Sequence, residues 1–387
     1  MLKFSINKLL SSSGLTGKEY YLDNLRISDE IRSKLVSLRD DARSGILEAW
    51  SYAKEQVKQD KDLYERVPLS KLEQLIKLKP RFKMQGSYVY GTIVEPAHNS
   101  QDIDLDDGMY IPMSVVQLDD KTMSAAMFEV VDKVLKTMAN ANGWKQIPKK
   151  TCSRLQTNEG IHLDIPCYAI PDEDFNRLRL FESLLVESNS AQDSELKIHT
   201  VNLALRNGEW LESNPEHIKE WVSRTKKLHP NFQDIVMIVK GLRDHNYTSG
   251  GPSSISLMVA IEKIMSSSPK LGDLTEELYN VVQKLPSVIS NELKHPHPGS
   301  AHLIIHSPTE PEKQDLRLKF DRFAMYFKQA LVTSLTERET MDILINLFGF
   351  RMPNDQTRVI RYSVDDNGLK TKKSKVMTPI QEHNTFG

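Results

Sequence analysis

A run of acidic residues that alternate with apolar ones constrains this chain more than any other feature. Asp102, Asp104 and Asp106 are separated by Ile103 and Leu105. Residues two apart in a β-strand point to the same face, so the three carboxylates share one face while the apolar pair can enter a core. Three acids on one strand face repel each other unless a cation neutralises them. Hard oxygen ligands favour a divalent metal, and Mg²⁺ is the natural candidate.

A short Gly-Ser turn precedes this acidic strand. In the sequence Gln85-Gly86-Ser87, the glycine lets the backbone approach a ligand closely, and the free N–H groups and the hydroxyl suit phosphate oxygens. Either feature alone is most often a solvated loop. The turn and the acidic strand together, in this order, predict metal-assisted phosphoryl or nucleotidyl transfer.

A further acidic residue lies in a predicted β-hairpin over residues 152–170. Asp164 stands between two apolar neighbours, where an unpaired carboxylate would be costly. Two explanations are open. Asp164 either shares a metal with Asp104 and Asp106, or it pairs with a structural arginine.

Helical periodicity dominates the rest of the chain. Apolar spacing predicts helices over residues 27–57, 119–141, 175–186, 231–244, 255–265, 310–331 and 335–348. Within the fourth helix, Lys240 and Arg243 lie three apart and can reach the same anion. Ser253 and Ser254 begin the next helix, either as an anion-binding end or as an ordinary serine cap. The histidines near residue 300 are interrupted by prolines, which favours a loop over a metal site.

Composition narrows the class of protein. The 387 residues carry a formal net charge of -1, which gives no electrostatic reason to expect a stable nucleic-acid partner. Two cysteines exclude a disulfide framework and a four-cysteine metal site. No apolar run reaches membrane-spanning length, so we expect no membrane association and a cytoplasmic location. The polar stretch from residue 352 onward predicts a mobile tail.

Five ordered motifs resemble the bacterial cGAS/DncV-like nucleotidyltransferases, with similarity highest to the subgroup typified by the Vibrio dinucleotide cyclase. The motifs are residues 85–87, 102–113, 162–171, 201–206 and 250–258. The resemblance implies an α+β fold with a polymerase-β-like nucleotidyltransferase lobe, a mixed β-sheet and a helical C-terminal lobe. The active site would lie in the cleft between the lobes. The expected boundaries are 1–215 for the catalytic lobe with its long N-terminal helix, 216–350 for the helical lobe and 351–387 for a flexible tail.

The resemblance also implies roles for individual residues. Carboxylates at Asp104, Asp106 and Asp164 would be catalytic and would bind two Mg²⁺ ions, with Mn²⁺ as an alternative metal. Nucleotide contacts would come from seven positions: Gln85, Gly86, Ser87, Arg154, Lys240, Ser253 and Ser254. The loop from residue 294 to 304 lacks the acid that the Vibrio-type enzyme carries there. The nucleobases of the substrates are therefore left open.

The implied activity is that of a cyclic oligonucleotide synthase. It would join two or three ribonucleoside triphosphates, with ATP and GTP as substrates and cyclic GMP-AMP or a related cyclic dinucleotide as product. In CBASS antiphage defence such a product activates an effector. The terminal Gly387 resembles that of family members conjugated by a ubiquitin-activating or ubiquitin-conjugating-like partner. The alternatives are nucleotide transfer to a protein or RNA acceptor, and a catalytically silent nucleotide sensor.

Overall fold

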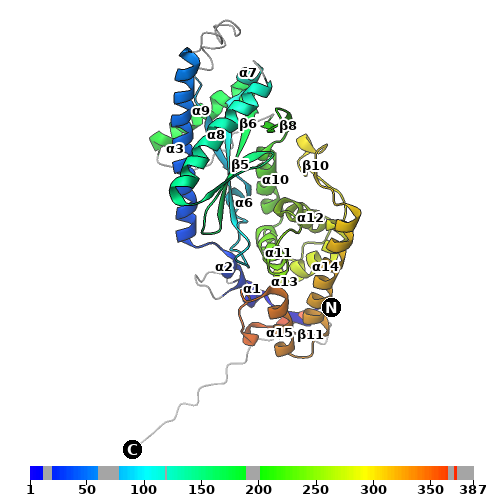
Figure 1. Cartoon of the computed structure of the whole chain (residues 1–387). Helices are drawn as coiled ribbons and strands as arrows, with labels where there is room; N and C mark the ends of the chain where they lie inside the picture. The colour runs from blue at the N-terminus through cyan, green and yellow to red at the C-terminus, as the bar shows by residue number, and fades with distance from the viewer. Residues whose placement is uncertain (12–19, 60–77, 118–119, 189–200, 365–369, 373–387) are drawn as a thin grey trace, which may run out of the picture.

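The protein has the expected α+β architecture, with a mixed β-sheet in one lobe and a bundle of helices in the other (Figure 1). The computed structural model describes residues 1–11, 20–59, 78–117, 120–188, 201–364 and 370–372. Within these residues, no helix combines the length and the apolarity needed to cross a membrane.

The catalytic lobe is built on a seven-stranded sheet. Its strands are β2 (Arg81–Gln85), β3 (Ile103–Pro112), β4 (Lys145–Pro148), β5 (Cys152–Gln156), β6 (Ile161–Ile170), β7 (Asn202–Ala204) and β8 (Trp210–Glu212). The order is β2-β3-β6-β5-β4, with β7 paired to both β6 and β8. The central pair β3 and β6 is parallel, and the other pairs are antiparallel. The two strands that carry the predicted carboxylates are therefore direct neighbours.

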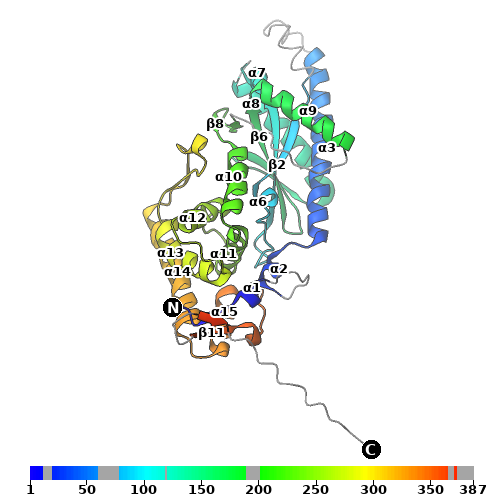
Figure 2. The same cartoon turned by 180° about the vertical axis from the view of Figure 1, so that it is seen from behind.

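Long helices cover this sheet. The helices α3 (Asp29–Gln59), α8 (Asp120–Asn142) and α9 (Asp172–Ser188) share one hydrophobic core with the strands (Figures 1 and 2). The predicted long helix before the catalytic strands is confirmed, and the Ser28 hydroxyl accepts a hydrogen bond from the Ile31 N–H near its start. All ten residues of β6 are buried, because β6 lies inside the sheet.

The helical lobe has its own hydrophobic core. It contains α10 (Pro215–Leu228), α11 (Phe232–Asn246), α12 (Ser254–Ser266), α13 (Leu274–Ile289), α14 (Glu310–Lys328) and α15 (Glu337–Phe348), with a π-helical turn at Gln329–Thr333. The short strands β9 (Leu293–Lys294) and β10 (Ile304–His306) form a hairpin between α13 and α14. The side chains of Asn214 and Ser253 cap α10 and α12, and such a cap is one of the two roles expected for Ser253. The helix α13 was not anticipated.

The expected domain boundaries need two corrections. The N-terminal elements β1 (Phe4–Ser5), α1 (Asn7–Leu10) and α2 (Tyr21–Leu25) pack into the core of the helical lobe, not into the catalytic lobe. The expected flexible tail from residue 351 is wrong for residues 351–364, because β11 (Ile360–Val364) pairs with β1 and Met352 and Val359 are buried. A strand β12 (Lys370–Lys372) pairs with β11. Gly387 lies outside the described residues.

Candidate active site

Strand register brings the predicted site together. In the parallel pair, Asp106 of β3 lies opposite Asp164 of β6. In the antiparallel pair, Arg154 of β5 lies opposite Asp164 from the other side. The Gly-Ser turn begins the short helix α6 (Gly86–Tyr90), and Gln85 at the end of β2 faces Asp106 across the sheet. Four neighbouring strands, β2, β3, β6 and β5, thus each contribute one polar or charged residue to a single row across the sheet.

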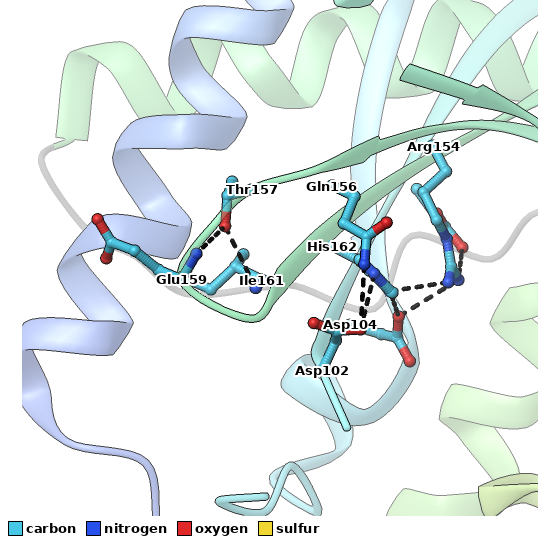
Figure 3. A network of polar contacts seen from close by, with 9 residues as sticks. Asp102, Asp104, Arg154, Gln156, Thr157, Glu159, Ile161 and His162 are labelled. Carbon is cyan, nitrogen blue, oxygen red and sulfur yellow. Dashed lines mark hydrogen bonds and ion pairs between the residues drawn. The ribbon is translucent and has the colours of Figure 1, made fainter. Parts of the chain in front are cut away.

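Arg154 lies at the β5 end of this row and takes part in a network of polar contacts (Figure 3). Its Nε donates to Asp164 Oδ1 at 2.7 Å, and its Nη2 donates to Asp164 Oδ2 at 2.6 Å. Of the two explanations for Asp164, the arginine pair is therefore the one that the structure contains. A bidentate guanidinium–carboxylate pair is a strong, geometrically specific interaction.

His162 links Arg154 to a second carboxylate pair (Figure 3). The Arg154 Nη1 lies 2.7 Å from His162 Nδ1, the same ring nitrogen lies 3.0 Å from Asp104 Oδ1, and Nε2 lies 3.0 Å from Asp102 Oδ2. A role for this histidine was not predicted from the sequence. Its position two residues before Asp164 on the same strand was the available signal, because such residues share a face.

Asp106 differs from its two neighbours. No hydrogen bond or ion pair is recorded for its carboxylate within the described residues, whereas Asp104 and Asp164 both contact Arg154. Burial, with repulsion from Asp164 and Asp104, raises the pKa of Asp106 to about 7. Burial also disfavours the charged form of Asp104, but the His162 hydrogen bond and Arg154 outweigh it and lower the pKa of Asp104.

Most of the predicted nucleotide contacts surround one cavity of about 290 Å³. Its lining includes the three carboxylates together with Gly86, Ser87, Arg154, Ser253 and Ser254. A second cavity of about 630 Å³ adjoins it, and both are lined by Gly86, Tyr90, Asp106 and Ile255. Gln85 lines the second cavity and donates from Nε2 to the Tyr168 hydroxyl at 2.9 Å.

The two cations predicted on α11 have other partners. Lys240 is buried, and its Nζ donates to the backbone carbonyl of Thr92 at 2.5 Å. Burial, with the nearby Arg243, lowers the pKa of Lys240 to about 7. Arg243 donates to Asp244 and to the carbonyl of Pro252, so it holds the turn that leads into α12. Neither side chain is among those that line the two cavities.

The carboxylates suit a divalent metal in their chemistry. They supply hard oxygen ligands, and Asp106 has a raised pKa that a cation would lower. Within the described residues, no three acidic, histidine or cysteine side chains already converge as a metal cluster. Asp164 instead forms an ion pair with Arg154 at 2.6 Å. Asp104, Asp106 and Asp164 remain the residues that would hold the metal.

The features of the site are those of a nucleotidyltransferase. They are a mixed sheet, a phosphate-compatible turn, carboxylates on two paired strands and a helical lobe beside them. Residues 80–168 match the model of the cyclic GMP-AMP synthase DncV-like nucleotidyltransferase domain, and residues 230–361 match the model of the cyclic GMP-AMP synthase C-terminal domain. The chain belongs to the family of DncV-like nucleotidyltransferases, as the sequence motifs predict. Enzymes of this kind generally use divalent metal ions.

Curated relatives and solved structures agree with this assignment. The chain is 29% identical to the cyclic GMP-AMP synthase of Vibrio cholerae over 311 residues, covering 74% of this chain and 71% of that protein. It is 32% identical to an Escherichia coli cyclic GMP-AMP synthase over 243 residues, covering 58% of this chain and 56%, or little more than half, of the relative. The crystal structure of V. cholerae DncV with a linear intermediate superposes with a TM-score of 0.77 at 24% identity, covering 94% of this chain and all of that one. A DncV complex with nonhydrolyzable GTP gives a TM-score of 0.71 at 25% identity, covering 88% of this chain and 96% of that one.

Proposed function

We propose that this chain joins ATP and GTP into a cyclic dinucleotide, cyclic GMP-AMP or a close relative of it. The observation that carries the proposal is the pair of adjoining cavities that meet at Asp106. One nucleotide on each side of this carboxylate would place a triphosphate and a ribose hydroxyl next to each other. The relatives named cyclic GMP-AMP synthase support this choice of product.

The residues around the first cavity have the groups that a triphosphate needs. The backbone of Gly86 and the hydroxyls of Ser87, Ser253 and Ser254 offer hydrogen-bond donors, and Arg154 offers a guanidinium. Lys240 would act from behind the site, through its hydrogen bond to the Thr92 carbonyl. Gln85 would contact the nucleotide in the second cavity.

Asp104, Asp106 and Asp164 would hold two Mg²⁺ ions, or Mn²⁺ in their place. When bound, the metal supplies charge stabilisation and a lowered pKa for the attacking hydroxyl. Asp164 would help to take the proton of that hydroxyl once it is released from Arg154. The ribose oxygen forms a bond to the α-phosphorus of the donor, and pyrophosphate leaves. A second, equivalent reaction within the linear product closes the ring.

The wider role of the protein extends this proposal. The product would activate an effector in CBASS antiphage defence. Gly387 would be the point of conjugation by a ubiquitin-activating or ubiquitin-conjugating-like partner. Transfer of one nucleotide to a protein or RNA acceptor, and a silent sensor, are the competing functions that the experiment below must separate.

The experiment incubates the purified chain with all four ribonucleoside triphosphates and Mg²⁺, removes terminal phosphates with a phosphatase and identifies the surviving product by mass spectrometry. A phosphatase-resistant dinucleotide is expected. Label on protein or RNA would instead establish acceptor transfer, and no product even with Mn²⁺ and a conjugating partner would favour the silent sensor.

Adjacent aspartates provide a matched control for the site. Asp106→Asn removes the unpartnered carboxylate and should reduce product formation to about one hundredth or less. Asp107 points to the other face of β3, where it accepts hydrogen bonds from Arg43 at 2.5 and 2.7 Å. Asp107→Asn should therefore lower stability but retain product formation below its unfolding temperature. Equal activity of wild type and Asp106→Asn would refute the site.

A further inference from the structure

The backbone carbonyls at the end of α6 are bound by side chains of the helical lobe. Three consecutive backbone carbonyls follow the phosphate-compatible turn, and each accepts a hydrogen bond from a side chain of α10 or α11. The pairs are Tyr90 with Lys226 at 2.6 Å, Gly91 with Gln233 at 2.7 Å, and Thr92 with Lys240 at 2.5 Å. We call these three donors the α6 clamp.

The clamp satisfies groups that the helix itself cannot. The last carbonyls of a helix have no partner within it, and a helix of five residues has few internal bonds. The N–H groups of Gly91 and Thr92 fold back onto the carbonyl of Ser87 or Tyr88, which closes the helix but leaves the later carbonyls free. Positive side chains are favourable at a helix C-terminus. The clamp therefore stabilises α6 from outside its own lobe.

The geometry around Gly91 shows how closely the clamp fits. Its φ of +67° is the left-handed conformation that favours glycine, and a Cβ there would lie 2.8 Å from Gln233 Nε2. The Lys226 amine lies on the same side. Lys226 is half-buried, and burial lowers its pKa. Within the described residues, no acidic side chain pairs with it to offset this effect. A lysine held in this way serves the backbone rather than a surface ion pair.

The other end of α6 touches the reacting groups. Gly86 lies directly against the Asp106 carboxylate, and Ser87 lines the first cavity. Because α6 spans only five residues, a displacement of its C-terminal end moves the whole helix. The separation of the two lobes would thus be transmitted to the turn beside Asp106.

We propose that Lys226 and Gln233 are positioning residues that set the triphosphate-binding turn of the catalytic lobe from the helical lobe. Lys240, which donates to the Thr92 carbonyl, is the third donor of the α6 clamp. The inference rests on the proposed function where it names a triphosphate. Its structural part, that α10 and α11 order α6, stands without that function.

The test compares Lys226→Met with two matched variants. Lys227→Met changes the exposed neighbour on α10 and serves as the control, while Lys226→Arg keeps a cationic donor. Hydrogen exchange should be faster at the amides of Gly91 and Thr92 in Lys226→Met, with the amides of β3 unchanged. The dissociation constant for nonhydrolysable ATP should rise about tenfold, as for a lost charge-assisted hydrogen bond. KM should rise more than kcat falls.

Lys227→Met should match the wild type in all three measurements, and Lys226→Arg should recover most of the loss. Unchanged exchange at Gly91 and Thr92, with a lower unfolding temperature alone, would overturn the proposal and leave Lys226 as a general interdomain contact. If the wild type binds the ATP analogue but forms no cyclic product, the proposed function fails while the clamp is still judged by exchange and binding. If it binds no nucleotide, exchange alone decides for or against the clamp.

Discussion

At the scale of single residues, Gly86 determines how closely the turn can approach the acidic strand. Its φ of +72° favours glycine, and a Cβ at this position would overlap the carboxylate of Asp106. Gly143 has a similar φ of +67°, but nothing lies within 4 Å of the place where its Cβ would be. The two glycines therefore separate backbone strain from a steric clash in the site.

Gly143→Ala should cost about 1 kcal/mol of stability, since it introduces only the left-handed strain. Gly86→Ala should cost about 1–3 kcal/mol more, because Asp106 must also move, and nucleotide transfer should be abolished. Chemical denaturation and product formation, measured on both variants, check this. Similar losses in the two variants would mean that the contact with Asp106 has no consequence.

The residue scale also shows what sequence could predict in the site. Alternation along the strand identifies Asp104, Asp106 and Asp164, because a period of two is local. The pair between Arg154 and Asp164 depends on the register of two strands, which alternation leaves undetermined. Lys240 has the expected helix position but a backbone partner from another lobe, and no local pattern reveals such a contact.

At the scale of elements, the hairpin of β9 and β10 contains a group of histidines that borders the second cavity. The rings of His217 and His297 stack with centroids 4.0 Å apart, and His295 lies beside His217 with centroids 6.4 Å apart. The Ser300 hydroxyl lies 2.8 Å from His217 Nδ1. The predicted loop with its prolines thus lies between two short paired strands, with its histidine rings packed against His217 of α10.

Protonation should weaken this packing. Burial, with the nearby His217 and His297, lowers the pKa of His295 to about 4 from an ordinary value of about 6.5. Between these values the unfolded chain binds a proton that the folded chain excludes, so stability rises with pH across this window. The contribution of neutral His295 is complete above about pH 6.5 and is lost progressively as the pH falls toward 4.

A variant without this titration tests the expectation. His295→Asn should show a shallower fall in unfolding temperature between pH 6.5 and pH 4 than the wild type. The carboxylates that titrate in the same range contribute equally to both proteins, so the difference between the two curves isolates His295. Parallel curves would show that the titration of His295 does not contribute to the pH dependence of stability.

Sequence predicted several elements with a regular apolar pattern, but it missed α13, whose buried positions Leu274, Leu278, Val281 and Leu285 also follow helical spacing. The helices α3, α8 and α11 have regular apolar stripes, and the alternation in β3 and β6 is clear. The strand β11 was missed because its partner is the two-residue strand β1 at the opposite end of the chain. A pairing over such a sequence distance has no local signal. Residues 1–11 and 20–25, which include β1, pack into the core of the helical lobe.

At the scale of the whole molecule, one buried arginine connects three distant segments. Arg351 is 3% exposed, and its guanidinium donates to the carbonyls of Glu95 and Gly241 at 2.6 and 2.8 Å. Its own carbonyl accepts from Asn24 at 2.8 Å. The segment after Arg351 then returns to the N-terminus through β11. The N-terminal and C-terminal parts of the chain therefore complete one core.

Two truncations test this closure. A chain ended after Lys372 keeps every described residue and serves as the reference. A chain ended after Arg351 loses the buried Met352 and Val359 and leaves β1 without its partner. Burial of two such side chains contributes about 3–6 kcal/mol, which is a large part of the stability of an ordinary domain.

Urea denaturation should show a clearly lower midpoint for the shorter chain, and weaker nucleotide binding should follow, because α11 belongs to the same core and carries two of the three clamp donors. Equal midpoints for the two truncations would place the structural boundary at residue 351 after all, and would make the pairing of β11 with β1 irrelevant to folding.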